Sequence, residues 1–182
     1  MKKSMKISIQ NIVASVDTKK TIYLEKLLNI LPEGEYEPEQ FPGLVFRMTD
    51  PKVATLIFRS GKIICVGAKS RSDIEKAIQK VIKYIKETGV NISPKDIKIT
   101  IENIVISADL GMELQLDTLA FQLESSEYEP EQFPGLVYRI YNPKVAFLLF
   151  SSGRIVCAGA KSMKAVNKAL DFLKKKLKSI KM

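Results

Sequence analysis

The sequence predicts an α+β fold made of two copies of one repeat that share an antiparallel sheet. Two observations predict it. The segment Tyr36–Val45 recurs letter for letter as Tyr128–Val137, at an offset of 92 residues, and 25 of the 35 positions in 36–70 match those in 128–162. Within each copy the apolar spacing changes in the order strand, helix, several short strands, helix, which is typical of an α+β protein.

We place the first repeat at residues 1–92 and the second at residues 93–182. The same offset relates Ile9–Val13 to Ile101–Val105, so the correspondence extends beyond the most similar segment. No spacer between the copies is longer than the stretch from Glu87 to Lys95. Two copies are too few for a solenoid, whose units bury their faces against further repeats, and a pseudo-twofold pair with a common core is therefore expected.

The first half of the repeat predicts a strand and then a short helix. Residues 6–15 show the mixed alternation of apolar and polar side chains that indicates a strand. Apolar residues then recur at helical spacing at Leu24, Leu27, Leu28 and Leu31. The run Leu31-Pro32-Glu33-Gly34 carries the residues that end helices, and the helix is expected to stop there.

The second half of the repeat predicts short strands and a longer helix. Turns are indicated at Phe41–Gly43, at Thr49–Pro51 and at Ser60–Gly61, and the last of these lies between two apolar runs, as in a β-hairpin. Ser72-Asp73-Ile74-Glu75 fits a capping box that opens a helix. The apolar stripe of that helix would consist of Ile74, Ala77, Ile78, Val81, Ile82 and Ile85.

The composition excludes several classes of function. The chain of 182 residues has no His, no Trp and two cysteines, Cys65 and Cys157. Without His there is no Ser-His-Asp triad, no His-based zinc site and no imidazole proton shuttle. Two cysteines build neither an all-cysteine zinc site nor a disulfide scaffold, and we interpret them as small core residues in a reducing compartment. The sequence also has no Gly-rich phosphate loop, no carboxylate cluster and no length left for a catalytic domain, so we expect no enzyme activity, no metal and no cofactor.

The charge and the hydropathy pattern indicate a partner class and a location. Lys and Arg number 29 against 20 Asp and Glu, which gives a net charge of +9 and favours a polyanion as partner. The longest apolar run, Val145–Phe150, has six residues, whereas about 20 are needed to span a bilayer. Met1–Lys6 leads directly into an alternating segment without the apolar region of a signal peptide. We expect a cytoplasmic protein with no membrane partner.

Several strands are apolar on both faces, which is unusual in an antiparallel sheet with one solvated face. In 52–58, Val53, Thr55 and Ile57 share one face, and Ala54, Leu56 and Phe58 share the other. The second copy repeats this pattern around residues 146–156. Two amphipathic helices per repeat cover only one face, so a second sheet, an oligomer partner or a ligand must cover the other.

The residues on that second face suit the minor groove of DNA. By strand parity it carries an apolar wall, with cations at its rim and an amide on the first strand. Sugar walls pack against aliphatic side chains, adenine N3 and thymine O2 accept hydrogen bonds, and phosphates line both edges of the groove. A Phe beside a turn can insert between base steps. The residues concerned are Leu56, Phe58, Ile64, Val66, Lys62, Arg47, Asn11 and Val13.

Two motifs make the chain similar to a known family. The decapeptide beginning Tyr36-Glu-Pro-Glu-Gln-Phe-Pro-Gly-Leu and the pattern Phe-x-Ser-Gly-Lys/Arg-Ile-x-Cys-x-Gly-Ala-Lys both occur twice, at the same spacing. With them the chain resembles the TATA-box-binding protein family over nearly its whole length. It looks more like the archaeal members because it has no long low-complexity extension before the first repeat; a location at the nucleoid would follow. The resemblance implies a saddle of about ten antiparallel strands with four helices on the convex side.

The resemblance also implies roles for individual residues on the concave face, which in this family kinks A·T-rich DNA. The intercalating residues correspond to Phe41, Phe58, Phe133 and Phe150. The base contacts correspond to Asn11, Asn103, Val13, Val105, Leu56, Ile64, Val66, Leu148, Val156 and Ala158. The phosphate contacts correspond to Arg47, Lys62, Arg139 and Arg154. Eukaryotic members have Thr where this chain has Val66 and Ala158, so two hydroxyl contacts are missing and readout should depend more on DNA shape.

The implied function is that of a general transcription initiation factor that binds and bends promoter DNA. Its implied partners are A·T-rich double-stranded DNA, transcription factor B, which would dock at Glu129 and Glu131, and RNA polymerase indirectly. A homodimer without DNA is a further expectation, because self-association would cover the same apolar face. Two alternatives stay open at this stage: an accessory nucleic-acid-binding module, such as the amino-terminal domain of type 3 ribonuclease H, and a homodimeric interaction protein without promoter function.

Overall fold

The computed structural model describes residues 5–180, which divide into two compact units. The first unit is formed by residues 11–102. The second unit is formed by residues 103–180 together with residues 5–10, which precede the first unit in the chain. The first strand therefore contributes its beginning to the second unit and its remainder to the first. Because the first unit also includes residues 93–102 of the second repeat, each unit contains a segment of the other sequence repeat.

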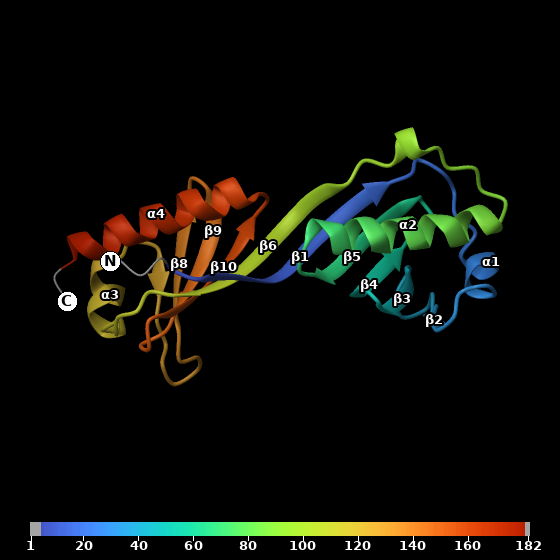
Figure 1. The fold of residues 1–182 in the computed structure, drawn as a ribbon. Helices are drawn as coiled ribbons and strands as arrows, with labels where there is room; N and C mark the ends of the chain where they lie inside the picture. The colour runs from blue at the N-terminus through green and yellow to red at the C-terminus, as the bar shows by residue number, and fades with distance from the viewer. Residues whose placement is uncertain (1–4, 181–182) are drawn as a thin grey trace. The chain divides into compact units, whose positions relative to one another are not determined.

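The two units repeat the same order of elements (Figure 1). Those of the first repeat are β1 (Ile7–Asp17), α1 (Leu24–Leu28), β2 (Gly34–Glu35), β3 (Leu44–Thr49), β4 (Lys52–Ile57), β5 (Lys62–Ala68) and α2 (Arg71–Glu87), followed by a 3-10 turn at Pro94–Asp96. Those of the second are β6 (Thr100–Asp109), α3 (Leu116–Gln122), β7 (Ser126–Glu127), β8 (Leu136–Tyr141), β9 (Lys144–Leu149), β10 (Arg154–Ala160) and α4 (Met163–Ser179).

The described part of the chain contains ten strands, which form an antiparallel sheet, and four α-helices. The strand order is β2-β3-β4-β5-β1-β6-β10-β9-β8-β7, so the second half of the order mirrors the first. Equivalent strands pair in equivalent registers: Leu56 lies opposite Ile64 in the first unit, and Leu148 lies opposite Val156 in the second. These findings confirm the predicted α+β class and the predicted number of strands and helices.

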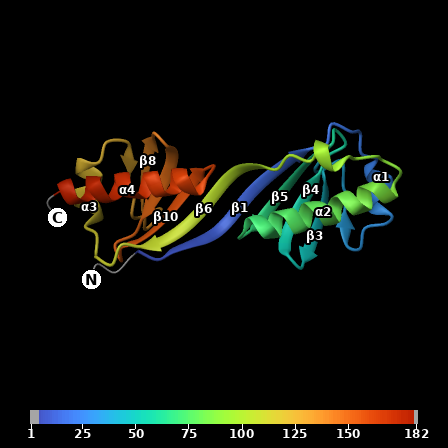
Figure 2. The ribbon, with the colours of Figure 1, turned by 45° about the horizontal axis from the view of Figure 1, so that its top comes forward.

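Each long helix covers one face of the strands in its own unit (Figure 2). In α2 the predicted apolar stripe is buried throughout, from Ile74 to Ile85. On the strands beneath, Ile57, Ile63 and Cys65 are inaccessible to solvent. The corresponding residues of the second unit, Leu149, Ile155 and Cys157, are equally buried. Each unit thus has its core between its long helix and one face of its strands, and the opposite face lacks a cover from its own helix.

Two helix boundaries differ from the prediction. The residue that caps α2 is Ser70, whose hydroxyl accepts a hydrogen bond from the backbone N–H of Asp73 at 3.1 Å, so the helix begins at Arg71 rather than after Ser72. The cap thus lies two residues before the predicted one. Helix α1 ends at Leu28, although Leu31 remains buried. Pro32 disfavours the helical conformation of the residue before it, which explains why the chain leaves the helix early.

Candidate nucleic-acid interface

The face of each unit opposite its long helix, which we call the open face, is apolar and partly exposed. In the first unit it carries Ala54, Leu56, Ile64 and Val66, all half-buried, whereas their neighbours along the strands belong to the core. The corresponding residues of the second unit, Ala146, Leu148, Val156 and Ala158, are half-buried as well. The prediction of strands with two apolar faces is therefore confirmed, and in neither unit does the unit's own helix cover the open face.

An asparagine on the open face of each unit is held by a backbone group. The side-chain oxygen Oδ1 of Asn11 accepts a hydrogen bond from the N–H of Gly67 at 2.8 Å, and Oδ1 of Asn103 accepts one from Gly159 at 2.7 Å. A backbone N–H only donates, so the atom facing it must be the carbonyl oxygen of the carboxamide. The amide NH₂ of each asparagine is thereby directed away from the sheet backbone.

A β-bulge makes these glycine N–H groups available. In the pairing of β1 with β5 the register shifts between Ile12 and Ala14, and an equivalent shift separates Cys157 from Ala160 in the pairing of β10 with β6. Gly67 and Gly159 lie in these shifts with φ angles of +93° and +106°, a conformation that favours glycine. The extra residue of a bulge has no partner in the ladder of backbone hydrogen bonds. The asparagine side chain accepts a hydrogen bond from the N–H that the bulge leaves unpaired.

Two phenylalanine pairs stand at corresponding places in the two units. The ring centroids of Phe41 and Phe58 are 5.8 Å apart with an interplanar angle of 69°, and those of Phe133 and Phe150 are 6.0 Å apart at 67°. Phe41 and Phe133 are 38% and 41% exposed, although large aromatic side chains usually contribute to a core. The structure therefore brings together the four phenylalanines that the resemblance singled out, as two edge-to-face pairs.

The four predicted phosphate-facing cations are all exposed, and two of them have acidic neighbours. Arg139 donates to Glu127 at 2.8 Å, and the guanidinium of Arg47 is 3.9 Å from the carboxylate of Glu35. Both pairs are solvent-exposed, so each contributes little to stability and is easily exchanged for another anion. Within residues 5–180 no ion pair involves Lys62 or Arg154. All four cations are therefore accessible to a polyanion.

Polar residues that sequence reasoning did not select also lie on this face. Ser15 donates to Glu102 at 2.6 Å in the first unit, and Gln10 donates to Ser107 at 2.8 Å in the second. These contacts occupy equivalent places, because the offset of 92 relates Gln10 to Glu102 and Ser15 to Ser107. The repeat offset could have identified these four residues as two equivalent pairs, but not their contacts.

The open face of the second unit is hollowed beside its phenylalanine pair. This depression has a volume of about 850 Å³, and its lining includes Lys6, Gln10, Phe150, Arg154 and Val156. A depression of this size would hold part of a large ligand. Cations, an amide, an aromatic ring and an aliphatic wall thus line one depression. Asp109 lines it as well, so cationic, acidic and apolar side chains border the same depression.

The loops that carry Glu129 and Glu131 in one copy, and Glu37 and Glu39 in the other, have the same sequence and the same local geometry. The N–H of Phe133 donates to the carbonyl of Glu129 at 3.0 Å, and that of Phe41 donates to Glu37 at 2.9 Å. All four glutamates are exposed. A partner that distinguishes the two loops must therefore contact residues outside them that differ between the copies, such as Phe121 of α3, which is 96% exposed and stands where the first copy has Asn29.

The cysteine thiols lie away from this face and are shielded from solvent. Cys65 and Cys157 are fully buried between the strands and the long helices. Burial raises the pKa of each thiol to about 11, which keeps it protonated and unreactive at neutral pH. Their interpretation as core residues agrees with this burial. Among the described residues no group of three or more His, Cys, Asp or Glu side chains could hold a metal ion.

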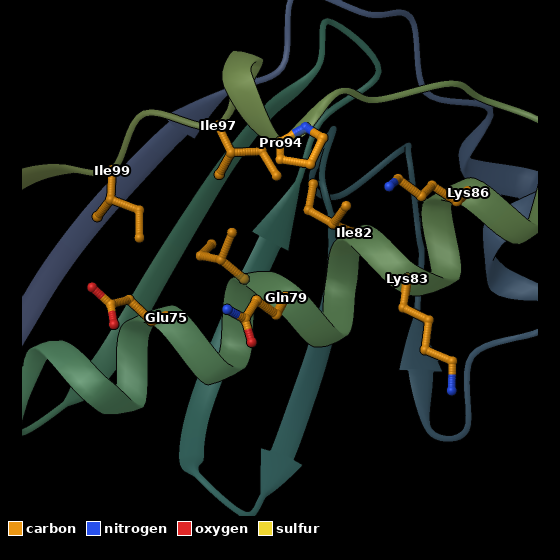
Figure 3. Close-up of a pocket in the computed structure, with 9 residues that line it drawn as sticks. Glu75, Gln79, Ile82, Lys83, Lys86, Pro94, Ile97 and Ile99 are labelled. Atoms are coloured by element: carbon orange, nitrogen blue, oxygen red, sulfur yellow. The ribbon is translucent and has the colours of Figure 1, made fainter.

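A second hollow lies on the side of the first unit that carries the helix (Figure 3). It has about 500 Å³ and separates α2 from the segment that follows it, with Ile82 facing Pro94 and Ile97 across the gap. The side chain of Lys83 points away from that segment. Five apolar residues line this hollow between helix and connector, together with Glu75, Gln79, Lys83 and Lys86 of the helix.

Comparison with known proteins identifies the family. A family model described as "Transcription factor TFIID (or TATA-binding protein, TBP)" matches residues 6–88 and 98–180, once for each repeat. The chain belongs to the TATA-box-binding protein family. It is 51% identical to the TATA-box-binding protein of Pyrococcus abyssi and 49% identical to that of Thermococcus kodakarensis, in each case over 94% of this chain and 92% of the relative.

A solved structure of the TATA-box-binding protein family has the same fold. The structure described as "Methanococcus jannaschii TBP" superposes with a TM-score of 0.90 at 49% identity, covering 96% of this chain and 99% of that one. The match confirms the predicted family fold. TATA-box-binding proteins are DNA-binding transcription factors rather than enzymes, which agrees with the expectation drawn from the composition. No helix in the described part of the chain is long and apolar enough to cross a membrane.

Proposed function

We propose that this chain is a general transcription initiation factor that binds A·T-rich promoter DNA in the minor groove through its open faces. The observation that carries the proposal is the fixed orientation of the two asparagines, each with its oxygen on a glycine N–H. The amide group that remains is a donor. The floor of the minor groove at A·T pairs presents only acceptors, adenine N3 and thymine O2, whereas a G·C pair adds the guanine N2 donor. The asparagines therefore suit A·T pairs.

The apolar wall supports the same ligand. Half-buried aliphatic side chains such as Leu56 and Ile64 would pack against deoxyribose, and Val13 and Val105 would contact the bases beside the asparagines. The exposed cations at the edges would meet the phosphates of the two strands. The larger part of the affinity would come from these phosphate contacts, and the choice of sequence from the groove floor and from DNA shape.

The phenylalanine pairs would kink the DNA. An apolar wedge inserted between base steps unstacks them at a cost of a few kcal/mol and bends the duplex towards the major groove, which brings more protein surface into contact. Phe41 with Phe58, and Phe133 with Phe150, would act at the two ends of the element. Pyrimidine–purine steps such as TA unstack most easily, so the deformation itself favours TATA-like sequences.

We further propose that the bent complex recruits transcription factor B at the second loop, and through it RNA polymerase. Glu129 and Glu131 are exposed there and would pair with basic side chains of the partner. Without DNA, a second copy of the chain would cover the same apolar open face. The DNA complex and the homodimer would then exclude each other, so TATA DNA should dissociate the dimer in gel filtration.

A bend-sensitive energy-transfer assay on a TATA-containing duplex tests the function. The wild-type chain should increase transfer between dyes at the two ends of the duplex. Phe58→Ala and Phe150→Ala should lose this bending to a greater extent than they lose salt-sensitive binding to random DNA. Phe121→Ala is the matched control, because Phe121 is exposed on α3 rather than on the open face. Wild-type bending in both open-face variants would refute the intercalation assignment.

A further inference from the structure

The Phe-Pro-Gly motif within each repeated decapeptide places a glycine beneath the phenylalanine pair. Gly43 and Gly135 are buried, although the phenylalanines two positions earlier, Phe41 and Phe133, are exposed. Each glycine immediately precedes a strand, β3 or β8, whose first residue belongs to the core. The backbone of each glycine is thus held in place by the strand that follows it, and the two phenylalanine rings lie over the glycine.

No side chain fits between this backbone and the rings. A Cβ atom on Gly43 would lie 2.7 Å from Cε1 of Phe41 and 3.0 Å from Cε1 of Phe58. In the second unit a Cβ on Gly135 would lie 2.7 Å from Cε1 of Phe133 and 3.0 Å from Cε1 of Phe150. The distances in the two copies agree to a tenth of an ångström, so the close approach is a property of the motif.

The backbone itself does not require glycine at these positions. Neither Gly43 nor Gly135 is among the glycines with a positive φ angle, so alanine could adopt the same backbone conformation. The atoms that a methyl group would meet first are the outer carbons of rings that can rotate. The substitution would therefore be accommodated by moving the rings rather than by distorting the strand.

We infer that Gly43 and Gly135 are positioning residues, which set the place and the tilt of the two phenylalanine pairs by leaving space under them. The inference rests on the proposed function, in which those pairs enter the base stack. A methyl group would force the nearer ring back by roughly 0.7 Å to reach ordinary contact, whereas a binding constellation must be held within about 0.5 Å of its productive geometry. The rings would remain exposed and apolar but would no longer match the opened base step.

Gly43→Ala and Gly135→Ala test this role in the bending assay, beside wild type and Phe58→Ala. Each should lose about half or more of the transfer change that Phe58→Ala loses, because the displaced rings keep their apolar area but not their alignment. Binding to random DNA and its salt dependence should not change. The melting temperature should be unchanged or slightly raised, since alanine restricts the unfolded chain.

Gly34→Ala is the matched control. Gly34 also has no positive φ, and a Cβ there would be 3.1 Å from Cδ1 of Leu28, a close but milder approach to a side chain that is not a phenylalanine. This variant should bend DNA as wild type does. A melting temperature for Gly43→Ala that falls below that of Gly34→Ala would overturn the inference, because the glycine would then be required by the fold.

A double-mutant cycle separates action through the rings from a direct clash with DNA. In the background Phe41→Ala/Phe58→Ala, the further change Gly43→Ala should have no effect on bending or affinity. An additional loss in that background would mean that the methyl group itself obstructs the DNA, and the positioning role would be wrong.

The outcomes also separate this inference from the proposed function. If wild type does not bend the duplex, or Phe58→Ala bends it fully, intercalation fails and the glycine role fails with it. If wild type bends the duplex and Phe58→Ala does not, but Gly43→Ala and Gly135→Ala bend it as wild type does, only the positioning role is overturned.

Discussion

The carbonyl oxygen of Asn11 accepts a hydrogen bond from the backbone N–H of Gly67, 56 residues further along the chain. The pair is repeated by Asn103 and Gly159. In the proposed function this bond would determine which end of the carboxamide faces the DNA, and the bulge in the sheet would thereby favour A·T over G·C pairs. The glycine that follows Val66 and Ala158 in the repeated motif is needed for the positive φ of that bulge.

Replacing either asparagine by aspartate should abolish its preference for A·T pairs. The carboxylate of Asn11→Asp could still accept from Gly67, but it would have no donor for adenine N3 or thymine O2 and would add a charge beside them. A good base-edge contact contributes about 1–3 kcal/mol to discrimination, so affinity for a TATA duplex should fall about 5- to 150-fold for each variant. Equilibrium titration by fluorescence anisotropy measures this change.

Asn167→Asp is the control for that experiment, because Asn167 is exposed on α4 and the substitution changes the net charge by the same amount. It should leave the affinity nearly unchanged. If Asn167→Asp weakened binding as much as Asn11→Asp, the effect would be one of overall charge, and the assigned role of the asparagines would be wrong.

The rim cations should determine the salt dependence of binding. Each phosphate contact contributes about −0.9 to the slope of log K against log salt concentration. Lys62→Gln and Arg154→Gln should therefore each make the slope less steep by about 0.9, for TATA and for random duplexes alike. Lys175→Gln, on the exposed side of α4, should not change the slope. A smaller slope in Lys175→Gln would show that DNA also contacts the helix side of the chain.

The two acidic loops should differ in function although their sequences are the same. Charge reversal at Glu129 and Glu131 should prevent a ternary complex with transcription factor B, because exposed carboxylates would meet the partner's basic side chains. Reversal at the equivalent Glu37 and Glu39 should leave that complex intact. DNA bending should be unaffected by either pair of substitutions. Gel-shift titration of transcription factor B against the DNA complex measures how much ternary complex each pair of substitutions allows. An equal loss of ternary complex for the two pairs would contradict docking at the second loop.

The buried thiols should make the protein less stable at high pH. A thiol ionises near pH 9.0 when unfolded, but burial raises the pKa of Cys65 and of Cys157 to about 11 in the folded chain. Between these values the unfolded state loses a proton that the folded state keeps. The contribution of each thiol to stability is therefore fully present below pH 9 and is lost as the pH rises towards 11. The slope is about 1.4 kcal/mol per pH unit for each thiol.

Urea unfolding of the wild type and of Cys65→Ala/Cys157→Ala at pH 8 and pH 10.5 isolates the contribution of the thiols. The variant should be less stable at pH 8 because two cavities are created, and its loss of stability between the two pH values should be smaller than that of the wild type. Equal losses in the two proteins would show that other groups account for the alkaline transition.

Much of the fold could be predicted from the sequence because its signals are local. Alternation along Lys52–Ile57 and Lys62–Val66 separates the core face from the open face, and the burial of Ile57 and Ile63 beside half-buried Leu56 and Ile64 agrees with it. Because the chain is duplicated, each assignment in the first repeat also applies to the equivalent residue of the second repeat. The boundary between the repeats at residues 92 and 93 stays a prediction, as do the DNA contacts of the individual residues.

Other features could not be predicted because they depend on contacts between distant segments. The bulge at Gly67 interrupts strict alternation and returns Ala68 to the core, which strand parity alone does not reveal. The orientation of the Asn11 carboxamide depends on a partner 56 residues away. The start of α2 differs from the predicted one because Ser70 and Ser72 are both residues that cap helices, and only the hydrogen bond from Asp73 distinguishes them.

Fluorescence of 2-aminopurine, placed at the terminal base step of each end of a TATA element, tests the central proposal most directly, because its emission rises when the base is unstacked. Binding of the wild-type chain should raise emission at both ends and leave it unchanged for a probe outside the element. Phe41→Ala/Phe58→Ala should suppress the rise at one end, and Phe133→Ala/Phe150→Ala at the other. Bound wild-type protein with no rise at either end would contradict minor-groove binding by phenylalanine insertion.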